Sequence, residues 1–316
     1  MSKKINLQET GNLLMAAQTL VLCCHVSPDG DTLGSALGLS HYLEQQGKKV
    51  TVLVDDDISH YLQFIPGIET CRRPVAEEQL EADLLVVIDA SSADRIGICQ
   101  QVTKAKAVLN IDHHISNTEF ADYLYLNAGA AAVGEIMCDL AAANSWKLDL
   151  VSATCFYIAM VTDSGSFMYS CTTPNTMCRA AEMLALGVKS AEINDCLKII
   201  ERSSLELLAK VLPSLTFEMG GRLAHMAITN EQYDHDINTE NYVNYPRYVE
   251  GVDVAVLFKA VEPQVTRVSM RSVATDVAAV AAGFGGGGHI RAAGCTVYAP
   301  LEEAKAQVIA ALAKVM

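Results

Sequence analysis

The sequence predicts an α/β fold: an N-terminal, mostly parallel sheet with helices on both faces, and a smaller C-terminal α/β domain joined by a helical linker. In the first half, short apolar strands alternate with helical patterns, which is typical of a parallel sheet covered on both sides. The last third contains further strand patterns. The chain of 316 residues also has a length at which one core usually gives way to two. We place the domains at 1–190 and 221–316, with the linker at 191–220.

The N-terminal strands are predicted at 19–25, 49–54, 84–89 and 106–111, and the helices at 33–46, 131–143, 151–163 and 176–186. Gly187 follows the last of these helices, where a glycine is typical of a helix C-cap. Ligands bind beyond the carboxyl ends of parallel strands. Polar clusters at 25–31, 89–94 and 112–114 stand at those ends, so we expect a site there.

The second half is expected to begin with a helical connection over 191–215. Strands are then predicted at 222–229, 252–261, 264–272 and 295–298, and helices at 276–282 and 301–315. This order predicts a separate, smaller α/β domain.

The composition excludes several classes of protein. With 51% hydrophobic and 19% charged residues, the chain should fold, and its apolar runs are too short to span a bilayer. A net charge of -14 disfavours a protein that coats DNA, so an anionic substrate should be small or locally attracted. The ten cysteines are scattered, which fits reduced thiols in the cytoplasm.

The first polar cluster is a candidate metal site. His25, Asp29 and Asp31 follow an apolar strand in a turn shaped by Pro28 and Gly30. Carboxylates with some imidazole suit Mn²⁺ or Mg²⁺. The alternative is a helix N-terminus, where Asp and Gly cap exposed amides.

The other clusters carry the same residue types. Asp89 ends one apolar strand, and Asp112, His113 and His114 end the next. Asp163 ends an apolar helix, where a carboxylate faces the negative end of the helix dipole and a bound cation would offset that cost. The alternatives are a turn-forming aspartate after a strand and an ordinary surface residue at Asp163.

Together these motifs resemble the DHH phosphoesterase superfamily in order and approximate spacing. The resemblance rests on the His25–Ser35 run, Asp89, the Asp-His-His triplet and Asp163. It implies two divalent metal ions, Mn²⁺ with Mg²⁺ as the alternative, and Asp89 as the bridging ligand. The implied ligands of one ion are His25, Asp29 and Asp89, and those of the other are Asp31, Asp89, His113 and Asp163. His114 is implied to contact the substrate phosphate, and Asp112 to orient its neighbours.

A glycine-rich segment ending at His289 is a second candidate site. Its glycines, which include Gly286, Gly287 and Gly288, would let backbone amides approach an anion, although such a run is also typical of a flexible turn. With Ser269-Met270-Arg271-Ser272, the segment resembles the substrate-binding domain of many DHH proteins. The resemblance implies that Arg271 and His289 hold a phosphate or base. Arg267 should share the strand face of Arg271.

The pairing of the two domains resembles the nanoRNase and 3′,5′-bisphosphonucleotide (pAp) phosphatase group. This implies hydrolysis of short oligonucleotides to 5′-mononucleotides and removal of the 3′-phosphate of pAp. The expected partners are short single-stranded oligonucleotides or small nucleotides, with a homodimer as candidate assembly, and neither a membrane nor duplex DNA. Two alternatives remain: a phosphodiesterase for cyclic di-AMP or its linear product, and a nucleotide-binding regulator without turnover.

Overall fold

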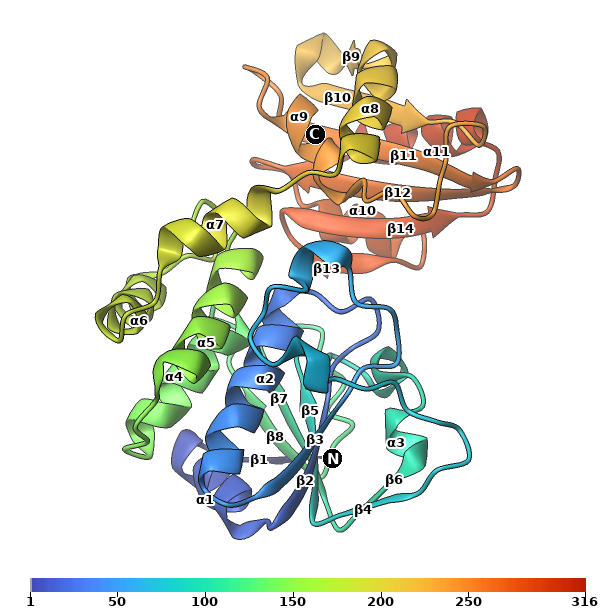
Figure 1. The fold of residues 1–316 in the computed structure, drawn as a ribbon. Coiled ribbons are helices and arrows are strands. Elements are labelled where there is room, and N and C mark those ends of the chain that lie inside the picture. Colours follow the sequence, from blue (N-terminus) through green and yellow to red (C-terminus); the bar gives the residue numbers. More distant parts are fainter. Residues whose placement is uncertain (1) are drawn as a thin grey trace. The chain divides into compact units, whose positions relative to one another are not determined.

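The computed structural model describes residues 2–316, and the chain divides into two compact units between Ile199 and Ile200 (Figure 1). Each unit has its own sheet and its own hydrophobic cores. The predicted fold class is confirmed in both units.

The sheet of the first unit is entirely parallel. Its six strands lie in the order β1-β8-β7-β5-β2-β3. Their bounds are Lys3–Lys4 (β1), Tyr123–Leu126 (β8), Val108–Asp112 (β7), Leu84–Ile88 (β5), Thr19–Cys23 (β2) and Lys49–Leu53 (β3). The central strand β5 is buried along its whole length, as expected for a strand covered on both faces.

Four helices cover one face of this sheet (Figure 1): α1 (Leu7–Ala16), α2 (Gly30–Gln45), α4 (Val133–Ala143) and α5 (Leu150–Asp163). The other face is covered by short pieces, namely η3 (Ala93–Ile96), α3 (Cys99–Val102) and the ribbon of β4 (Leu80–Ala82) and β6 (Thr103–Ala105). Helices α2 and α5 approach closely because Gly34 has no side chain. A Cβ atom there would lie 2.5 Å from the carbonyl oxygen of Cys155.

Helix boundaries follow local capping signals. Asp29 caps α2 by accepting hydrogen bonds from the amides of Asp31 and Thr32 at 3.0 Å each, so the helix begins three residues before the predicted start. Helix α6 (Pro174–Ala185) ends before Gly187, which has the positive φ of +101° expected of a C-cap glycine.

The helical connection predicted over 191–215 is helical over most of its length but is not one helix. The chain forms α7 (Ser190–Lys198), breaks, and then forms α8 (Arg202–Val211). The break has a packing reason, since Leu207, Leu208 and Val211 of α8 belong to a core of the second unit.

The second unit contains a mixed sheet in the order β13-β14-β12-β11-β10-β9. The bounds are Gly287–His289 (β13), Ala292–Val297 (β14), Val265–Ser272 (β12), Val254–Glu262 (β11), Leu223–Ile228 (β10) and Thr216–Glu218 (β9). Only the β10–β11 pair is parallel among these described strands. Helices α10 (Val277–Ala282) and α11 (Leu301–Leu312) pack on one face, while α8, η6 (Glu240–Val243) and α9 (Asn244–Arg247) cover part of the other.

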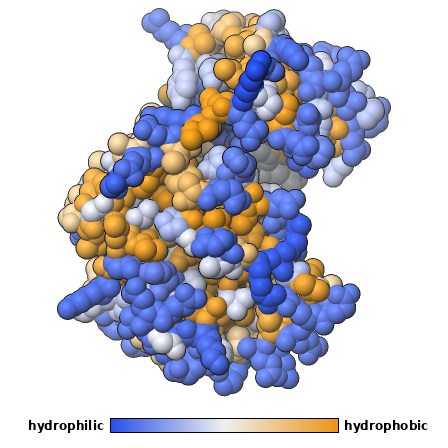
Figure 2. All heavy atoms as spheres, in the orientation of Figure 1, coloured by the Kyte–Doolittle hydropathy of each residue, from blue (hydrophilic) through white to orange (hydrophobic). Residues whose placement is uncertain are grey.

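The surface is largely polar in the view of Figure 2, with apolar residues gathered over α4 to α6. Exposed apolar side chains of α5 and α6 include Leu150, Met177 and Leu184. Among residues 2–316, every helix is too short or too polar to cross a membrane.

Candidate metal centre

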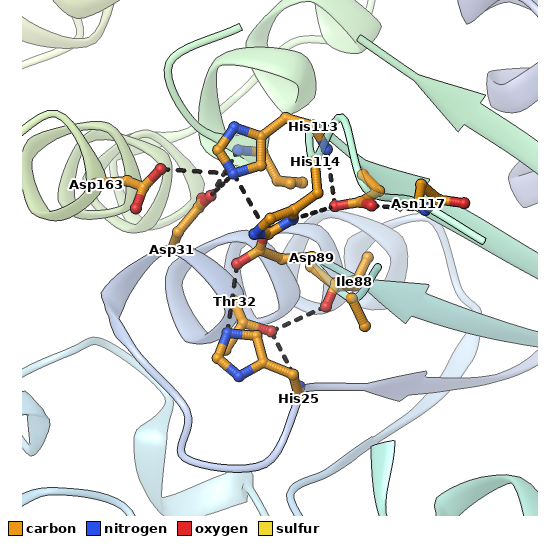
Figure 3. A network of polar contacts seen from close by, with 12 residues as sticks. His25, Asp31, Thr32, Ile88, Asp89, His113, His114, Asn117 and Asp163 are labelled. Carbon is orange, nitrogen blue, oxygen red and sulfur yellow. Dashed lines mark hydrogen bonds and ion pairs between the residues drawn. The ribbon is translucent and has the colours of Figure 1, made fainter. Parts of the chain in front are cut away.

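The polar clusters of the first unit converge at the carboxyl ends of β2, β5 and β7 (Figure 3). Parallel strands end at the same edge of a sheet, so residues that follow three different strands become neighbours. The last turn of α5 adds a fourth segment. The structure brings together all six side chains expected to bind metal: His25, Asp29, Asp31, Asp89, His113 and Asp163.

His25, Asp29 and Asp89 form one group. The Nε2 atom of His25 lies 3.6 Å from Oδ1 of Asp29 and 3.5 Å from Oδ2 of Asp89. Burial disfavours charge on both partners, but the carboxylates raise the pKa of His25, and the hydrogen bond and charge of His25 lower the pKa of Asp29. The donor atoms of these three residues lie within 4.8 Å of one another, close enough to hold one metal ion.

The second group centres on His113. Its Nε2 atom lies 3.4 Å from Oδ1 of Asp89, 3.5 Å from Oδ2 of Asp163 and 3.9 Å from Oδ2 of Asp31. Asp89 therefore offers one oxygen to each group, as its implied bridging position requires. Asp31, Asp89 and His113 are close enough to hold a second ion, and Asp163 joins them through its contact with His113.

Backbone carbonyls orient both imidazoles. Nδ1 of His25 lies 2.8 Å from the carbonyl oxygen of Val26, and Nδ1 of His113 lies 3.1 Å from that of Ala130. A carbonyl can only accept, so each Nδ1 carries a proton, and in the neutral imidazole each Nε2 is left with the lone pair that can bind a metal ion. This is the tautomer that metal-binding histidines usually adopt.

Asp31 is held by the start of α4. Its carboxylate accepts hydrogen bonds from the amides of Val133 at 2.7 Å and Gly134 at 3.0 Å, and from Oγ of Ser35 at 3.1 Å. A helix N-terminus favours a negative charge. Ser35, at the end of the His25–Ser35 run, thus positions Asp31.

Asp89 has two features that fit a metal ligand. Its backbone has a φ of +59°, a conformation that costs free energy in a residue other than glycine and is typical of functional positions. Its Oδ1 atom is buried and has no hydrogen-bond partner among the described residues. A buried carboxylate oxygen without a donor is costly unless a cation faces it, so the donor set fits divalent ions.

Asp112 and His114 form a separate hydrogen-bonded unit beside this centre. Nδ1 of His114 donates to Oδ1 of Asp112 at 2.7 Å, and Nδ2 of Asn117 donates to Oδ2 of Asp112 at 2.6 Å. The same Asn117 group donates to Oδ1 of Asn110 at 2.7 Å. The His114 ring is partly exposed and Asp112 is buried, so Asp112 can orient an imidazole that solvent reaches.

Replacing Asn117 with alanine should lower kcat for a phosphoester substrate by about 10- to 100-fold, because loss of an orienting hydrogen bond usually costs that much. The metal affinity and thermal stability should change far less. Steady-state kinetics, metal titration and thermal unfolding test this. A variant with wild-type kcat, or one that loses metal in proportion to activity, contradicts the orienting role.

The charges of the centre make the metal-free protein pH-sensitive. Burial, with the negative charges of Asp29 and Asp89, raises the pKa of Asp163 to about 7 despite the opposing charge of His113. Burial lowers the pKa of His113, but Asp89, Asp163 and Asp31 outweigh it and raise that pKa to about 9. Both groups therefore hold their protons to higher pH in the folded state than in the unfolded state.

Without metal, the free energy of unfolding should fall as the pH rises from about 5 to about 9, because the folded state binds more protons than the unfolded state in this range. With Mn²⁺ the trend should reverse, since the ligands must lose protons to bind metal. Thermal unfolding in EDTA and in Mn²⁺ measures both trends. Asp163→Asn should flatten the EDTA curve below about pH 7, and a stability that rises with pH in EDTA contradicts the account.

The C-terminal candidates lie in the second sheet. Arg267 and Arg271 alternate with buried residues along β12, so they share the predicted face. The predicted glycine loop is wrong in part, because Gly287, Gly288 and His289 form strand β13 at the sheet edge. Close packing explains two of the glycines, since a Cβ atom would lie 2.2 Å from the carbonyl oxygen of Gly294 at Gly286 and 2.4 Å from that of Ala292 at Gly288, whereas Gly287 faces open space. Their role in binding a phosphate stays a prediction.

Sequence reasoning missed several residues that shape the centre. Oγ1 of Thr32 donates to the carbonyl of Ile88 at 3.0 Å and lies 3.4 Å from the amide of His25, joining the ends of β2 and β5. An Nη2 atom of Arg95 lies 3.3 Å from Nδ1 of His25. Thr32 lies inside the His25–Ser35 run that first marked the site, so that motif was the available signal, whereas nothing local marks Asn117.

Comparison with known proteins agrees with this arrangement. The model of the DHH family, N-terminal domain, matches residues 19–160, and that of the DHHA1 domain matches residues 221–316. A Thermus thermophilus protein named bifunctional oligoribonuclease and PAP phosphatase NrnA is 33% identical over 93% of this chain and 89% of its own. A Bacillus subtilis protein of the same name is 25% identical, over 89% of this chain and 90% of its own.

A solved structure shows the same architecture. The crystal structure of an exopolyphosphatase-related protein from Bacteroides fragilis superposes with a TM-score of 0.87 at 26% identity, and covers 98% of this chain and 95% of that chain. The family matches cover both sheets apart from the edge strands β1 and β9, and all the residues of the centre except Asp163, which lies just beyond the first match. The chain therefore belongs to the DHH family of phosphoesterases and is a hydrolase that acts on phosphoester bonds.

Proposed function

We propose that this protein is a manganese-dependent phosphoesterase that hydrolyses short oligonucleotides to 5′-mononucleotides and also dephosphorylates pAp. The observation that carries the proposal is the likeness of nearly the whole chain, both domains included, to relatives whose names state these two activities. The DHH family is metal-dependent, and the His and Asp groups of the first unit could bind the metal.

The chain's own residues divide the work. His25, Asp29 and Asp89 would hold one ion, and Asp31, Asp89, His113 and Asp163 the other. Two such ions would supply an activated water at neutral pH and would stabilise charge on the phosphoryl oxygens. His114, fixed by Asp112, would donate to a phosphate oxygen of the substrate through its Nε2 side. No serine or cysteine nucleophile is needed.

The second unit would select the substrate. Arg271 donates one hydrogen bond, from Nη1 to the carbonyl of Met270 at 3.0 Å, while its buried Nε has no hydrogen-bond partner among the described residues. A guanidinium with an unused donor suits a phosphate. We assign Arg271, His289 and the glycines at 286–288 to the phosphate or base of the nucleotide, with Arg267 on the same face.

Manganese is the proposed metal because the groups combine carboxylate oxygens with imidazole nitrogens. Magnesium favours sites with oxygen ligands and several waters, whereas imidazole suits softer divalent ions. The proposed setting is the cytoplasm, since the ten free cysteines fit reducing conditions. The net charge of -14 disfavours duplex DNA, and a homodimer remains a prediction.

The substrate class is tested by incubating purified protein and Mn²⁺ with 5′-phosphorylated dinucleotides, pAp, pyrophosphate, cyclic di-AMP and its linear product. Dinucleotides and pAp should be turned over fastest. The cyclic substrate belongs in the panel because a Listeria monocytogenes cyclic-di-AMP phosphodiesterase is 24% identical to this chain, which spans 49% of that protein. Turnover of pyrophosphate alone contradicts the proposal.

A further inference from the structure

Two cations face each other on the second sheet without an acidic partner. Lys259 on β11 pairs directly with Arg267 on β12, and Arg267 pairs on its other side with Thr296 on β14. Neither cation forms an ion pair with any residue in 2–316. Like charges directly opposite each other destabilise a sheet, so this arrangement has a cost that a bound anion would offset.

Lys259 is also partly withdrawn from water. Its Nζ atom donates to Oγ1 of Thr239 at 3.4 Å, a long hydrogen bond to a neutral group. Burial and the charge of Arg267 lower the pKa of Lys259, and the smaller opposing effect of the charge of Glu240 does not cancel them. A half-buried ammonium with such weak compensation is characteristic of a binding position rather than of a solvated surface.

The pair shares its face with the residues assigned above to the substrate. The cross-strand partners of Arg271 are Ala255 and Ala292, and Ser269 between the two arginines faces Gly294. On the β14 side, small residues thus form the floor between Arg271 and Arg267, while Leu257 lies on the β11 side. Arg267 and Arg271 are four residues apart, and four residues along a strand span about 13 Å. Neighbouring phosphates of a single strand are linked by too few covalent bonds to span that distance.

We propose that Lys259 and Arg267 form a second phosphate subsite that binds an oligonucleotide at least two nucleotides beyond the phosphate at Arg271. This inference rests on the proposed oligonucleotide hydrolysis and deepens it, because the subsite sets the preferred chain length. A 5′-phosphorylated dinucleotide has only two, neighbouring phosphates and cannot span the distance from Arg271 to this subsite. Trinucleotides and longer chains gain the contact.

Binding by the full-length, Mn²⁺-loaded protein tests the subsite. The probes are 5′-phosphorylated oligoadenylates of two to five nucleotides whose bridging ester oxygens are replaced by methylene, so that they keep their charge and are not cleaved. Calorimetric titration should show an affinity that rises with length in the wild type. In Lys259→Met the gain in affinity from the dinucleotide to the longer probes should be about tenfold smaller, which is the contribution of one charge-assisted hydrogen bond. Lys259→Arg should keep the full gain.

The control is Lys314→Met, which removes the same charge from an exposed position just after α11, a helix that packs on the other face of the sheet. It should bind like the wild type. Thermal unfolding should show Lys259→Met to be at least as stable as the wild type, since the substitution removes a half-buried charge. An unchanged rise with length in Lys259→Met, or no rise in the wild type, overturns the subsite. Failure of the wild type to cleave ordinary oligonucleotides would instead overturn the proposed activity, whatever the binding result.

Discussion

Replacing Asp89 with asparagine should lower kcat by at least about a thousandfold, which corresponds to roughly 4 kcal/mol of lost transition-state stabilisation. Asp89 is the side chain that faces both groups of the centre, with one oxygen 3.5 Å from His25 and the other 3.4 Å from His113. An amide offers one neutral oxygen in place of two charged ones, so neither group keeps its donors. Steady-state kinetics with Mn²⁺ and a 5′-phosphorylated dinucleotide measure the loss.

Two measurements separate this loss from misfolding. The metal-free Asp89→Asn protein should be at least as stable as the metal-free wild type, because the substitution removes one of several crowded carboxylates. Metal titration should show weaker binding. Asp195→Asn makes the same change at an exposed position on α7 and should leave kcat unaffected. Retention of more than a tenth of wild-type activity by Asp89→Asn contradicts a bridging role.

Replacing His114 with asparagine should lower kcat/KM by about 100- to 1,000-fold, the usual effect of losing one positioned donor to a phosphate in the transition state. The asparagine amide can still donate to Asp112, as Nδ1 of His114 does at 2.7 Å. Only the outer Nε2 side of the imidazole is lost. Metal affinity should therefore stay close to that of the wild type, unlike that of Asp89→Asn.

His41→Asn is the matched control for this substitution. His41 lies on α2, is partly exposed and contacts Asp149 at 2.8 Å, outside the centre. Its variant should keep wild-type kinetics. One hydrogen bond to a charged group contributes more than a factor of about three. If kcat/KM of His114→Asn falls by less than this, or if added Mn²⁺ restores its activity, His114 does not act on the substrate in the way proposed.

The carboxyl ends of β2, β5 and β7 show how far sequence reasoning reaches. Apolar strands followed at once by Asp or His are local patterns, and a parallel sheet then forces their neighbours together whatever the details of the helices. The convergence of His25, Asp89 and His113 was predictable for this reason. Asp163 was harder, because its place depends on how α5 packs against α2.

Other features depend on contacts between distant segments and leave no local mark. The hydrogen bond from Asn117 to Asp112 requires the loop after β7 to turn back, and the amides that hold Asp31 come from Val133 and Gly134, on another helix. The strand at Gly287–His289 was missed because glycine has a low strand propensity, and only pairing with β14 makes it a strand.

The most direct test of the account is product analysis of a 5′-phosphorylated diribonucleotide incubated with wild-type protein and with Asp89→Asn, each with Mn²⁺. We expect complete conversion to 5′-mononucleotides by the wild type, none in EDTA, and almost none by the variant. Failure of the wild type to cleave the dinucleotide, or equal cleavage by Asp89→Asn, would contradict this expectation.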